Sequence, residues 1–162
     1  MREIGTLHPR PPYDLSILLA ILSRFASQTL DIARDGAYWR VLRGAEDGAV
    51  LLRVRQTGTQ EQPALTVDLA EERGAHGLSD TLLLSRLAHI LNTDADNHAF
   101  YALADSHPQL ATLIAPLRGV PAWRTDSLYE ALVMTIIEQQ IAWKAALKAQ
   151  RVATIQTLGG SG

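Results

Sequence analysis

The sequence predicts an α+β fold, in which helices accompany a small antiparallel sheet. Three observations lead to this prediction. The apolar residues of 15–25 recur every three to four positions, which indicates a helix, whereas those of 29–69 alternate every two positions, which indicates strands. The helical period returns from residue 79 onward. The alternating segments are joined by short polar connections, which favour antiparallel neighbours over crossover units.

The first helix is predicted to begin after Asp14 and to end near Ser27. Aspartate is a preferred N-capping residue because its carboxylate accepts hydrogen bonds from the free amides of the first turn. The residues that precede the helix are interpreted only as a short extended lead. The apolar residues of the helix share one face: Leu15, Leu18, Leu19, Leu22 and Phe25.

Four strands are predicted to follow as an antiparallel meander. Asp35-Gly36 is a hairpin turn signal, and Gly48 and Gly58 mark the next two connections. The alternating segments are residues 29–34, 38–43, 50–55 and 64–69.

The rest of the chain is predicted to be helical. Its elements are residues 79–92, a short helix through Leu103 capped at Thr93-Asp94-Ala95-Asp96, a short helix from Pro108, and residues 127–139 and 142–158. The first of these should direct Leu82, Leu83, Leu87 and Ile90 inward. The proline-bearing link 119–123 predicts a boundary between an α+β domain, residues 1–118, and the start of a helical domain, residues 119–162.

The composition excludes several classes of protein. The 162 residues are 47% hydrophobic and 20% charged with a net charge of -2, which excludes an intrinsically disordered chain. No apolar run approaches the ~18 residues of a membrane span, so no membrane partner is expected. The chain has 0 Cys, and its 5 His form no i,i+4 pair, so no metal site is expected. The sequence has no glycine-rich phosphate loop, and no organic cofactor is expected. These features predict a soluble, cytoplasmic protein.

Charge is unevenly distributed along the chain. Residues 1–117 carry 10 Lys and Arg against 14 Asp and Glu, whereas residues 118–162 carry 5 against 3. Lys144, Lys148 and Arg151 recur at helical spacing and form a basic stripe. Such a stripe is either a solvated helix face or a surface that contacts phosphates. Spacing alone leaves both interpretations open.

Three stretches of the chain carry a more specific pattern. They are Pro11-Pro12-Tyr13-Asp14 with its leucine-rich helix, Gly36-Ala37-Tyr38-Trp39-Arg40, and Leu117-Arg118-Gly119 followed by residues 127–133 and 136–141. In this order they resemble the N-terminal half of the DNA-3-methyladenine glycosylase II family, in the helix-hairpin-helix DNA glycosylase superfamily. The resemblance implies an N-terminal domain like one repeat of the TATA-binding-protein fold, followed by the first helices of an all-α glycosylase domain.

The resemblance also implies a function in DNA base-excision repair. The partner would be damaged duplex DNA, from which an alkylated base is flipped and cut at its N-glycosidic bond. A side chain must fill the gap that the flipped base leaves. The family's wedge loop matches Gln139, Gln140 and Ile141, with Gln140 at the wedge position. Ile21 matches a base-pocket position that holds a bulky aromatic residue in the family.

The resemblance implies no catalytic residue within this chain. The helix-hairpin-helix motif and the catalytic aspartate are expected beyond Gly162, so a C-terminal glycosylase half, in cis or as a fragment, is an expected partner. Glu138 is interpreted as a helix C-terminal residue. Leu128, Leu132, Ile136 and Ile137 are predicted to form a buried stripe, and Ile136, Ile137 and Ile141 an apolar face through which the chain alone would associate. The alternative is a non-catalytic module that binds DNA or protein.

Overall fold

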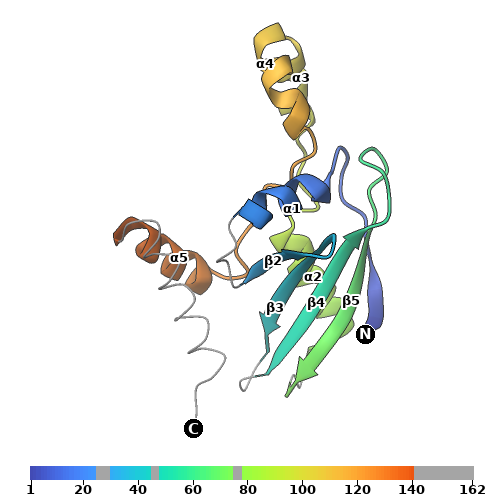
Figure 1. The fold of residues 1–162 in the computed structure, drawn as a ribbon, viewed down its shortest axis with the longest axis vertical. Helices are drawn as coiled ribbons and strands as arrows, with labels where there is room; N and C mark the ends of the chain where they lie inside the picture. Colours follow the sequence, from blue (N-terminus) through green and yellow to red (C-terminus); the bar gives the residue numbers. More distant parts are fainter. Residues whose placement is uncertain (25–29, 45–47, 75–77, 141–162) are drawn as a thin grey trace.

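The computed structural model describes residues 1–24, 30–44, 48–74 and 78–140 and has the predicted α+β fold (Figure 1). Its elements are β1 (Arg2–Leu7), α1 (Leu15–Arg24), β2 (Asp31–Arg34), β3 (Ala37–Arg43), β4 (Ala49–Gln56), β5 (Leu65–Arg73), α2 (Asp80–Ile90), α3 (His98–Asp105), α4 (Pro108–Ile114), a 3₁₀ turn (Ala115–Leu117) and α5 (Leu128–Gln140). None of the helices in these ranges is long and apolar enough to cross a membrane.

The sheet has five antiparallel strands in the order β1-β5-β4-β3-β2. Strands β2 to β5 are the predicted meander, and Asp35 and Gly36 both take positive φ values, 52° and 68°, as a tight hairpin requires. The sequence prediction missed β1, which pairs with β5 along the opposite edge. Its six residues contain Gly5 and lack a clear alternation, so no local signal marks this strand.

Gly5 explains how α2 approaches β1 so closely. A Cβ at this position would lie 2.8 Å from Cδ1 of Leu84, and the residue has a φ of +153°. Only glycine leaves room for the Leu84 side chain while adopting this backbone conformation. The glycine that obscures the strand in the sequence therefore allows the packing of the helix on it.

A single core lies between the sheet and two helices. Because side chains alternate along each strand, one sheet face is almost wholly apolar, and α1 and α2 cover it near the β2 and β1 edges. Burying each large side chain contributes roughly 2 kcal/mol. The buried residues of the core are Tyr13, Leu15, Leu18, Leu22, Tyr38, Leu42, Val50, Leu52, Val54, Leu65, Val67, Leu69, Leu83, Leu87, Ile90 and Leu91.

Two local predictions about the helices were wrong. Leu82 is exposed, because the stripe of α2 that faces the sheet consists of Leu83, Leu87 and Ile90. Helix α3 begins at His98 and not within Thr93–Asp96. Asp96 still contributes to its start, since its Oδ1 accepts a hydrogen bond of 3.0 Å from the His98 amide.

Helices α3 and α4 form a hairpin that projects from one end of the molecule (Figure 1). Helix α4 begins at Pro108, as predicted. The hairpin and the 3₁₀ turn after it expose large apolar side chains: Phe100, Leu103, Leu110, Leu113 and Leu117.

The link after the hairpin is attached to the α+β unit by backbone hydrogen bonds. The carbonyl of Gly119 accepts from the Asp14 amide at 2.7 Å, and its own amide donates to the hydroxyl of Tyr101 at 2.8 Å. The Arg124 amide donates to the Ile90 carbonyl at 2.7 Å. The segment predicted as a domain boundary is thus anchored on both sides, and the division into residues 1–118 and 119–162 stays a prediction.

Candidate nucleic-acid interface

Helix α5 contains most of residues 127–133 and 136–141, the stretches from which the sequence predicts a DNA-contacting loop. It begins at Leu128 because Ser127 caps it, with its Oγ accepting from the Glu130 amide at 3.2 Å. The pattern Ser127-x-x-Glu130 is that of a capping box, in which the glutamate would bond back to the serine amide. Here the carboxylate of Glu130 binds an arginine of the sheet instead.

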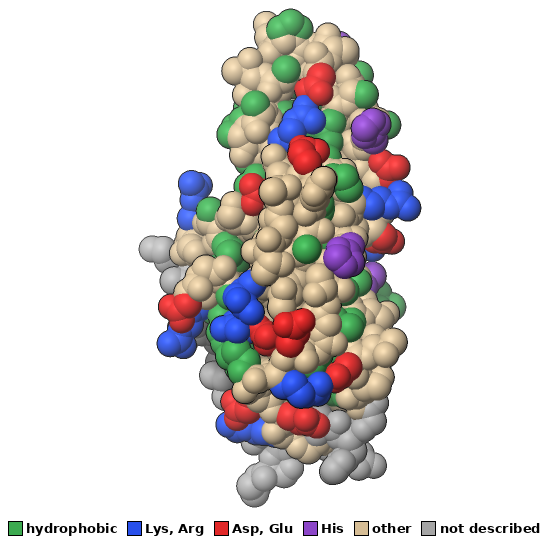
Figure 2. All heavy atoms as spheres, turned by 90° about the vertical axis from the view of Figure 1, so that its right-hand side faces the viewer, with side chains coloured by type: hydrophobic (Ala, Val, Ile, Leu, Met, Phe, Trp, Pro, Cys, Tyr) green, Lys and Arg blue, Asp and Glu red, His purple; other side chains and the backbone are tan. Residues whose placement is uncertain are grey.

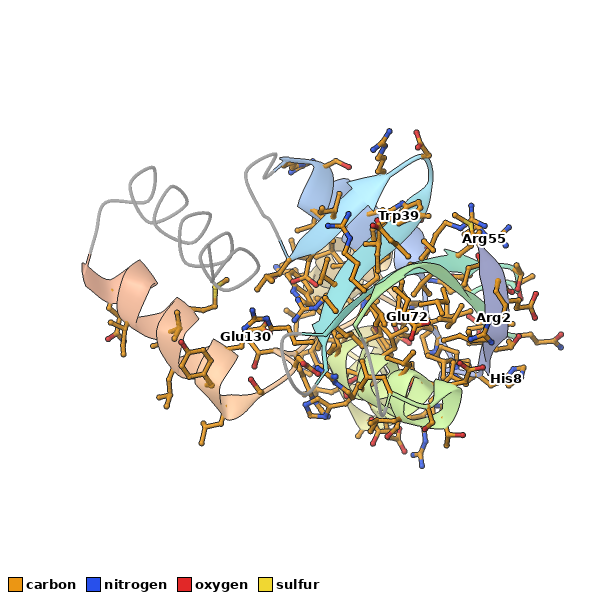
Figure 3. The ribbon with its side chains drawn as sticks, turned by 90° about the horizontal axis from the view of Figure 1, so that it is seen from below. Arg2, His8, Trp39, Arg55, Glu72 and Glu130 are labelled. Carbon is orange, nitrogen blue, oxygen red and sulfur yellow. The ribbon has the colours of Figure 1, made fainter. Side chains whose placement is uncertain are left out.

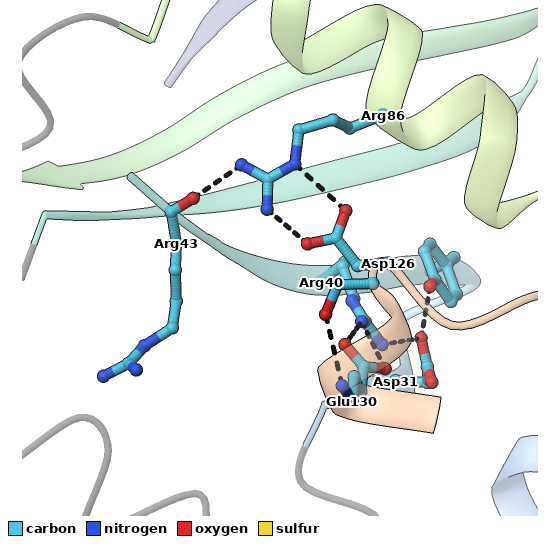
Figure 4. Close-up of polar contacts among 8 residues, drawn as sticks. Asp31, Arg40, Arg43, Arg86, Asp126 and Glu130 are labelled. Carbon is cyan, nitrogen blue, oxygen red and sulfur yellow. Dashed lines mark hydrogen bonds and ion pairs between the residues drawn. The ribbon is translucent and has the colours of Figure 1, made fainter. Parts of the chain in front are cut away.

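That arginine is Arg40 on β3, whose side chain is 1% exposed. Its Nη2 donates to both carboxylate oxygens of Glu130, at 2.8 and 2.7 Å, and its Nη1 donates to Asp31 of β2 at 2.8 Å (Figure 4). The hydroxyl of Tyr38 also donates to Asp31. One buried guanidinium therefore joins β2, β3 and α5.

A second arginine binds the residues just before α5. Nε of Arg86 on α2 donates to Oδ1 of Asp126 at 3.0 Å, and its Nη2 donates to Oδ2 of the same carboxylate. Its Nη1 donates to the carbonyl of Arg43, the last residue of β3, at 2.5 Å (Figure 4). Asp126 and Glu130 thus attach the start of α5 at two points, one to α2 and one to the sheet.

The environment keeps Arg40 charged and Tyr38 neutral. Burial would lower the pKa of the Arg40 guanidinium, but the negative charges of Asp31 and Glu130 outweigh it and raise this pKa above its ordinary value. Burial, followed by the charge of Asp31, raises the pKa of the Tyr38 hydroxyl well above its usual range. Both groups therefore act as hydrogen-bond donors at neutral pH.

The face of α5 that turns away from the sheet is apolar and exposed. Leu128, Leu132 and Ile136, predicted to be part of a buried stripe, are 75%, 53% and 58% exposed, and Tyr129 is 70% exposed. Figure 3 shows α5 standing apart from the sheet, with Glu130 directed toward it. The prediction of burial was wrong for these three positions, because the side of α5 that meets the sheet carries Glu130.

Two of the predicted DNA-contacting residues lie at the C-terminal end of α5. Gln139 is exposed on the helix, and Gln140 is its last residue. Ile141, Lys144, Lys148 and Arg151 lie outside the described residues. Ile21, the predicted base-pocket residue, is half-buried on α1. The structure therefore describes the helix that leads to the predicted wedge loop but not the basic stripe beyond it.

The uncovered face of the sheet carries a third arginine cluster. Nε and Nη2 of Arg53 donate to Oδ2 of Asp68 at 3.0 and 2.8 Å, and its guanidinium carbon lies 5.9 Å from the ring centroid of Trp39. Arg55 also reaches Asp68, at 3.3 Å. These residues alternate with core residues along β3, β4 and β5, so they point away from α1 and α2.

No metal cluster is found in the described part of the chain, and charges of both signs mix on the side of the molecule that Figure 2 shows. Figure 2 shows basic and acidic side chains interspersed over one side of the molecule. Within the described ranges, no group of three or more histidine, aspartate or glutamate side chains could hold a metal ion. The candidate interface therefore rests on α5 and the residues after it.

Sequence reasoning missed the two arginine pairs of α5, although one signal was available. Along β3, Arg40 alternates in phase with Tyr38 and Leu42, which point into the core. An arginine at an inward position predicts a buried carboxylate partner, because an unpaired buried charge is very costly. Its partner Glu130 comes from 90 residues away, and only the fold reveals it.

Comparisons with known proteins identify the family. A family model described as the AlkA N-terminal domain matches residues 5–123. The fold is similar to that of a 3-methyladenine DNA-glycosylase from Archaeoglobus fulgidus, with a TM-score of 0.63 and 16% sequence identity over 89% of this chain. The chain spans 47% of that enzyme's length. None of the curated proteins matches the chain. The family match covers most of the sequence, and the chain therefore belongs to the AlkA N-terminal domain family.

Proposed function

We propose that this chain is the N-terminal portion of a DNA base-excision repair glycosylase that removes alkylated bases such as 3-methyladenine. The observation that carries the proposal is the family match over residues 5–123. In this proposal the sheet unit corresponds to one repeat of the TATA-binding-protein fold, and α5 is among the first helices of the glycosylase domain. In this proposal, hydrolysis of the N-glycosidic bond takes place in a helical C-terminal half, present in cis or as a fragment.

The position of Gln139 and Gln140 at the end of α5 supports a base-flipping function. The first turn of α5 is fixed by Asp126 and Glu130, and its far end carries Gln139 and Gln140. In the proposal Gln140 fills the gap left by the flipped nucleotide and bonds to the orphaned base. Ile21 supplies apolar surface to the base pocket. The basic stripe at Lys144, Lys148 and Arg151 contacts phosphates.

The test is base release by the polypeptide that contains this chain, purified from its source cells with its intact mass measured first. It is incubated with methylated duplex DNA, and free bases are quantified by mass spectrometry. Release of 3-methyladenine supports the proposal. A polypeptide of about twice 17.7 kDa that releases no methylated base contradicts it. Gln140→Ala should lower the rate at least about tenfold because the wedge is lost, and Thr135→Ala, at an exposed position of α5 outside the wedge loop, is the matched control.

One observation favours a second function, that of a non-catalytic binding module. The apolar side chains exposed on α5, and those exposed on the α3–α4 hairpin, are of the kind that binds protein. In the first proposal these side chains receive the C-terminal half, whereas in the second they receive another protein. Lys144→Glu combined with Lys148→Glu should abolish DNA binding by a glycosylase and leave protein binding by a module unchanged. The cytoplasmic location remains a prediction of the sequence.

A further inference from the structure

Helix α5 is held to the rest of the described molecule mainly by polar contacts at its start. In the described ranges it makes few close backbone approaches to any other helix or strand. Four of its large side chains, Leu128, Tyr129, Leu132 and Ile136, are exposed, whereas Val133 and Met134 are half-buried. Asp126 and Glu130 reach the α+β unit, where they bind Arg86 and Arg40 (Figure 4). The direction of α5 therefore depends on a small number of ion pairs.

We infer that Arg40 and Arg86 are positioning residues that fix the direction of α5, and with it the probe residues at its C-terminal end. One ion pair would leave the helix free to pivot about a single point. The two carboxylates are four residues apart, and their arginines come from two different elements, β3 and α2. Two such ion pairs fix the direction of the helix axis. The functional part of this inference rests on the proposed glycosylase function, while the structural part does not.

The length of α5 makes such fixing important. From Glu130 to Gln139 the helix extends over nine residues, which is ~14 Å at about 1.5 Å per residue. A tilt of roughly 10° about the first turn would then move the probe end by ~2 Å. A misplacement of about 1 Å in a reacting complex can lower a rate ~100-fold. Small errors at the arginine pairs are therefore amplified at the probe.

The burial of Arg40 makes its pair directional. Its guanidinium is 1% exposed and is bound by Asp31 on one side and Glu130 on the other, so solvent cannot replace either carboxylate without opening the core. A planar guanidinium also fixes the angle at which a carboxylate approaches. The pair of Arg2 with Asp80 differs in burial, because its side chains are 58% and 41% exposed.

The chain provides a matched control on the other face of the sheet. Arg53 binds Asp68 through Nε and Nη2, and its guanidinium lies near the ring of Trp39. All three residues belong to strands. The pair therefore has comparable chemistry without a link to α5. Weakening this pair should alter the sheet locally and leave the direction of α5 unchanged.

The test is a distance measurement between two spin labels in the full chain. The sequence contains 0 Cys, so Ser85→Cys on α2 and Thr135→Cys on α5, both at exposed positions, introduce the only thiols. Asp126→Asn combined with Glu130→Gln changes no core side chain, so the sheet unit should still fold. We expect the interspin distance distribution to become at least twice as wide. The control Asp68→Asn should leave it unchanged.

A charge exchange separates positioning from a general loss of structure. Asp126→Arg alone should widen the distribution, and adding Arg86→Glu should narrow it again, because the pair re-forms with reversed charges. An unchanged width in the variant Asp126→Asn with Glu130→Gln, or equal widening by Asp68→Asn, would overturn the inference. In a polypeptide that releases methylated bases, the variant Asp126→Asn with Glu130→Gln should lower kcat at least tenfold with little change in KM. If the parent releases none, the proposed function fails, but the label distances still decide the positioning role.

Discussion

Many leucine side chains are buried in the sheet unit with α1 and α2, but those on the helices α3, α4 and α5 are exposed. Leu18 of α1 and Leu87 of α2 are 0% exposed, whereas Leu113 of α4 and Leu128 of α5 are 64% and 75% exposed. The sheet with α1 and α2 thus forms a complete core, while α3, α4 and α5 present large apolar side chains that are mostly exposed. This difference indicates that stability resides in the first unit.

Core truncation should give the largest effect and tests the comparison most directly. Leu18→Ala should lower the free energy of unfolding by about 3 kcal/mol, because it removes buried apolar surface and leaves a cavity. Leu113→Ala, in the projecting hairpin, should change it by less than about 0.5 kcal/mol. Urea denaturation followed by circular dichroism measures both. Equal losses would show that the hairpin belongs to the same core.

Gly5→Ala tests how tightly the first unit is packed. The new Cβ would clash with Cδ1 of Leu84 at 2.8 Å and would sit on a backbone with a φ of +153°. We expect a loss of about 2 kcal/mol, from strain and displaced packing. Gly36→Ala has no neighbour within 4 Å at its Cβ and serves as a control for backbone strain alone. A smaller loss at Gly5 than at Gly36 would mean that α2 can move away from β1.

The buried Tyr13 should make the first unit less stable at alkaline pH. Burial raises the pKa of the Tyr13 hydroxyl, so the folded state keeps this proton when the unfolded chain has lost it. The resulting stability is complete below the unfolded pKa of about 10 and is lost as pH rises beyond it, at up to ~1.4 kcal/mol per pH unit. Tyr13→Phe should reduce the dependence of stability on pH. Urea unfolding at pH values from about 9 to about 11, roughly one unit on either side of the ordinary tyrosine pKa, measures this dependence. Tyr129→Phe, with an exposed ring, is the matched control. An unchanged slope for Tyr13→Phe would contradict the assignment.

Polar substitutions on α5 should have the smallest effect on stability and a separate effect on association. Leu128→Ser combined with Leu132→Ser removes side chains that face solvent, so the free energy of unfolding should change by less than about 0.5 kcal/mol. If the exposed apolar face drives self-association of the chain alone, the same variant should sediment as a monomer at concentrations where the parent does not. A parent that stays monomeric would sharpen the comparison by assigning this face to a different partner.

The sequence predicted what depends on local patterns and missed what depends on distant residues. The meander followed from alternation and from the Asp35-Gly36 turn, whose backbone requirements are local. Strand β1 has no local signature and exists because β5 offers it an edge. Leu128 and Leu132 were predicted to be buried from their spacing, but spacing identifies a shared face and not what covers it.

The candidate site shows the same limit. The pattern over residues 127–141 predicted the helix that the structure shows as α5, because a motif is a property of the sequence. The probe role of the residues at its end stays a prediction. The pairing of Arg40 with Glu130 spans 90 residues, and Arg86 reaches Asp126 across 40. Such pairs arise only when the fold brings β3, α2 and α5 together.

The pairing of the first strand with the last has a consequence for synthesis on the ribosome. β1 is made first, yet its only partner among the described strands is β5, which ends at Arg73. The meander from β2 to β5 can assemble from neighbouring strands as it emerges, whereas the N-terminal strand must wait for the far edge to appear. At roughly 5–20 residues per second this delay lasts several seconds. During that interval β1 has no partner strand and is open to pairing with other chains, and the arrival of β5 ends this exposure.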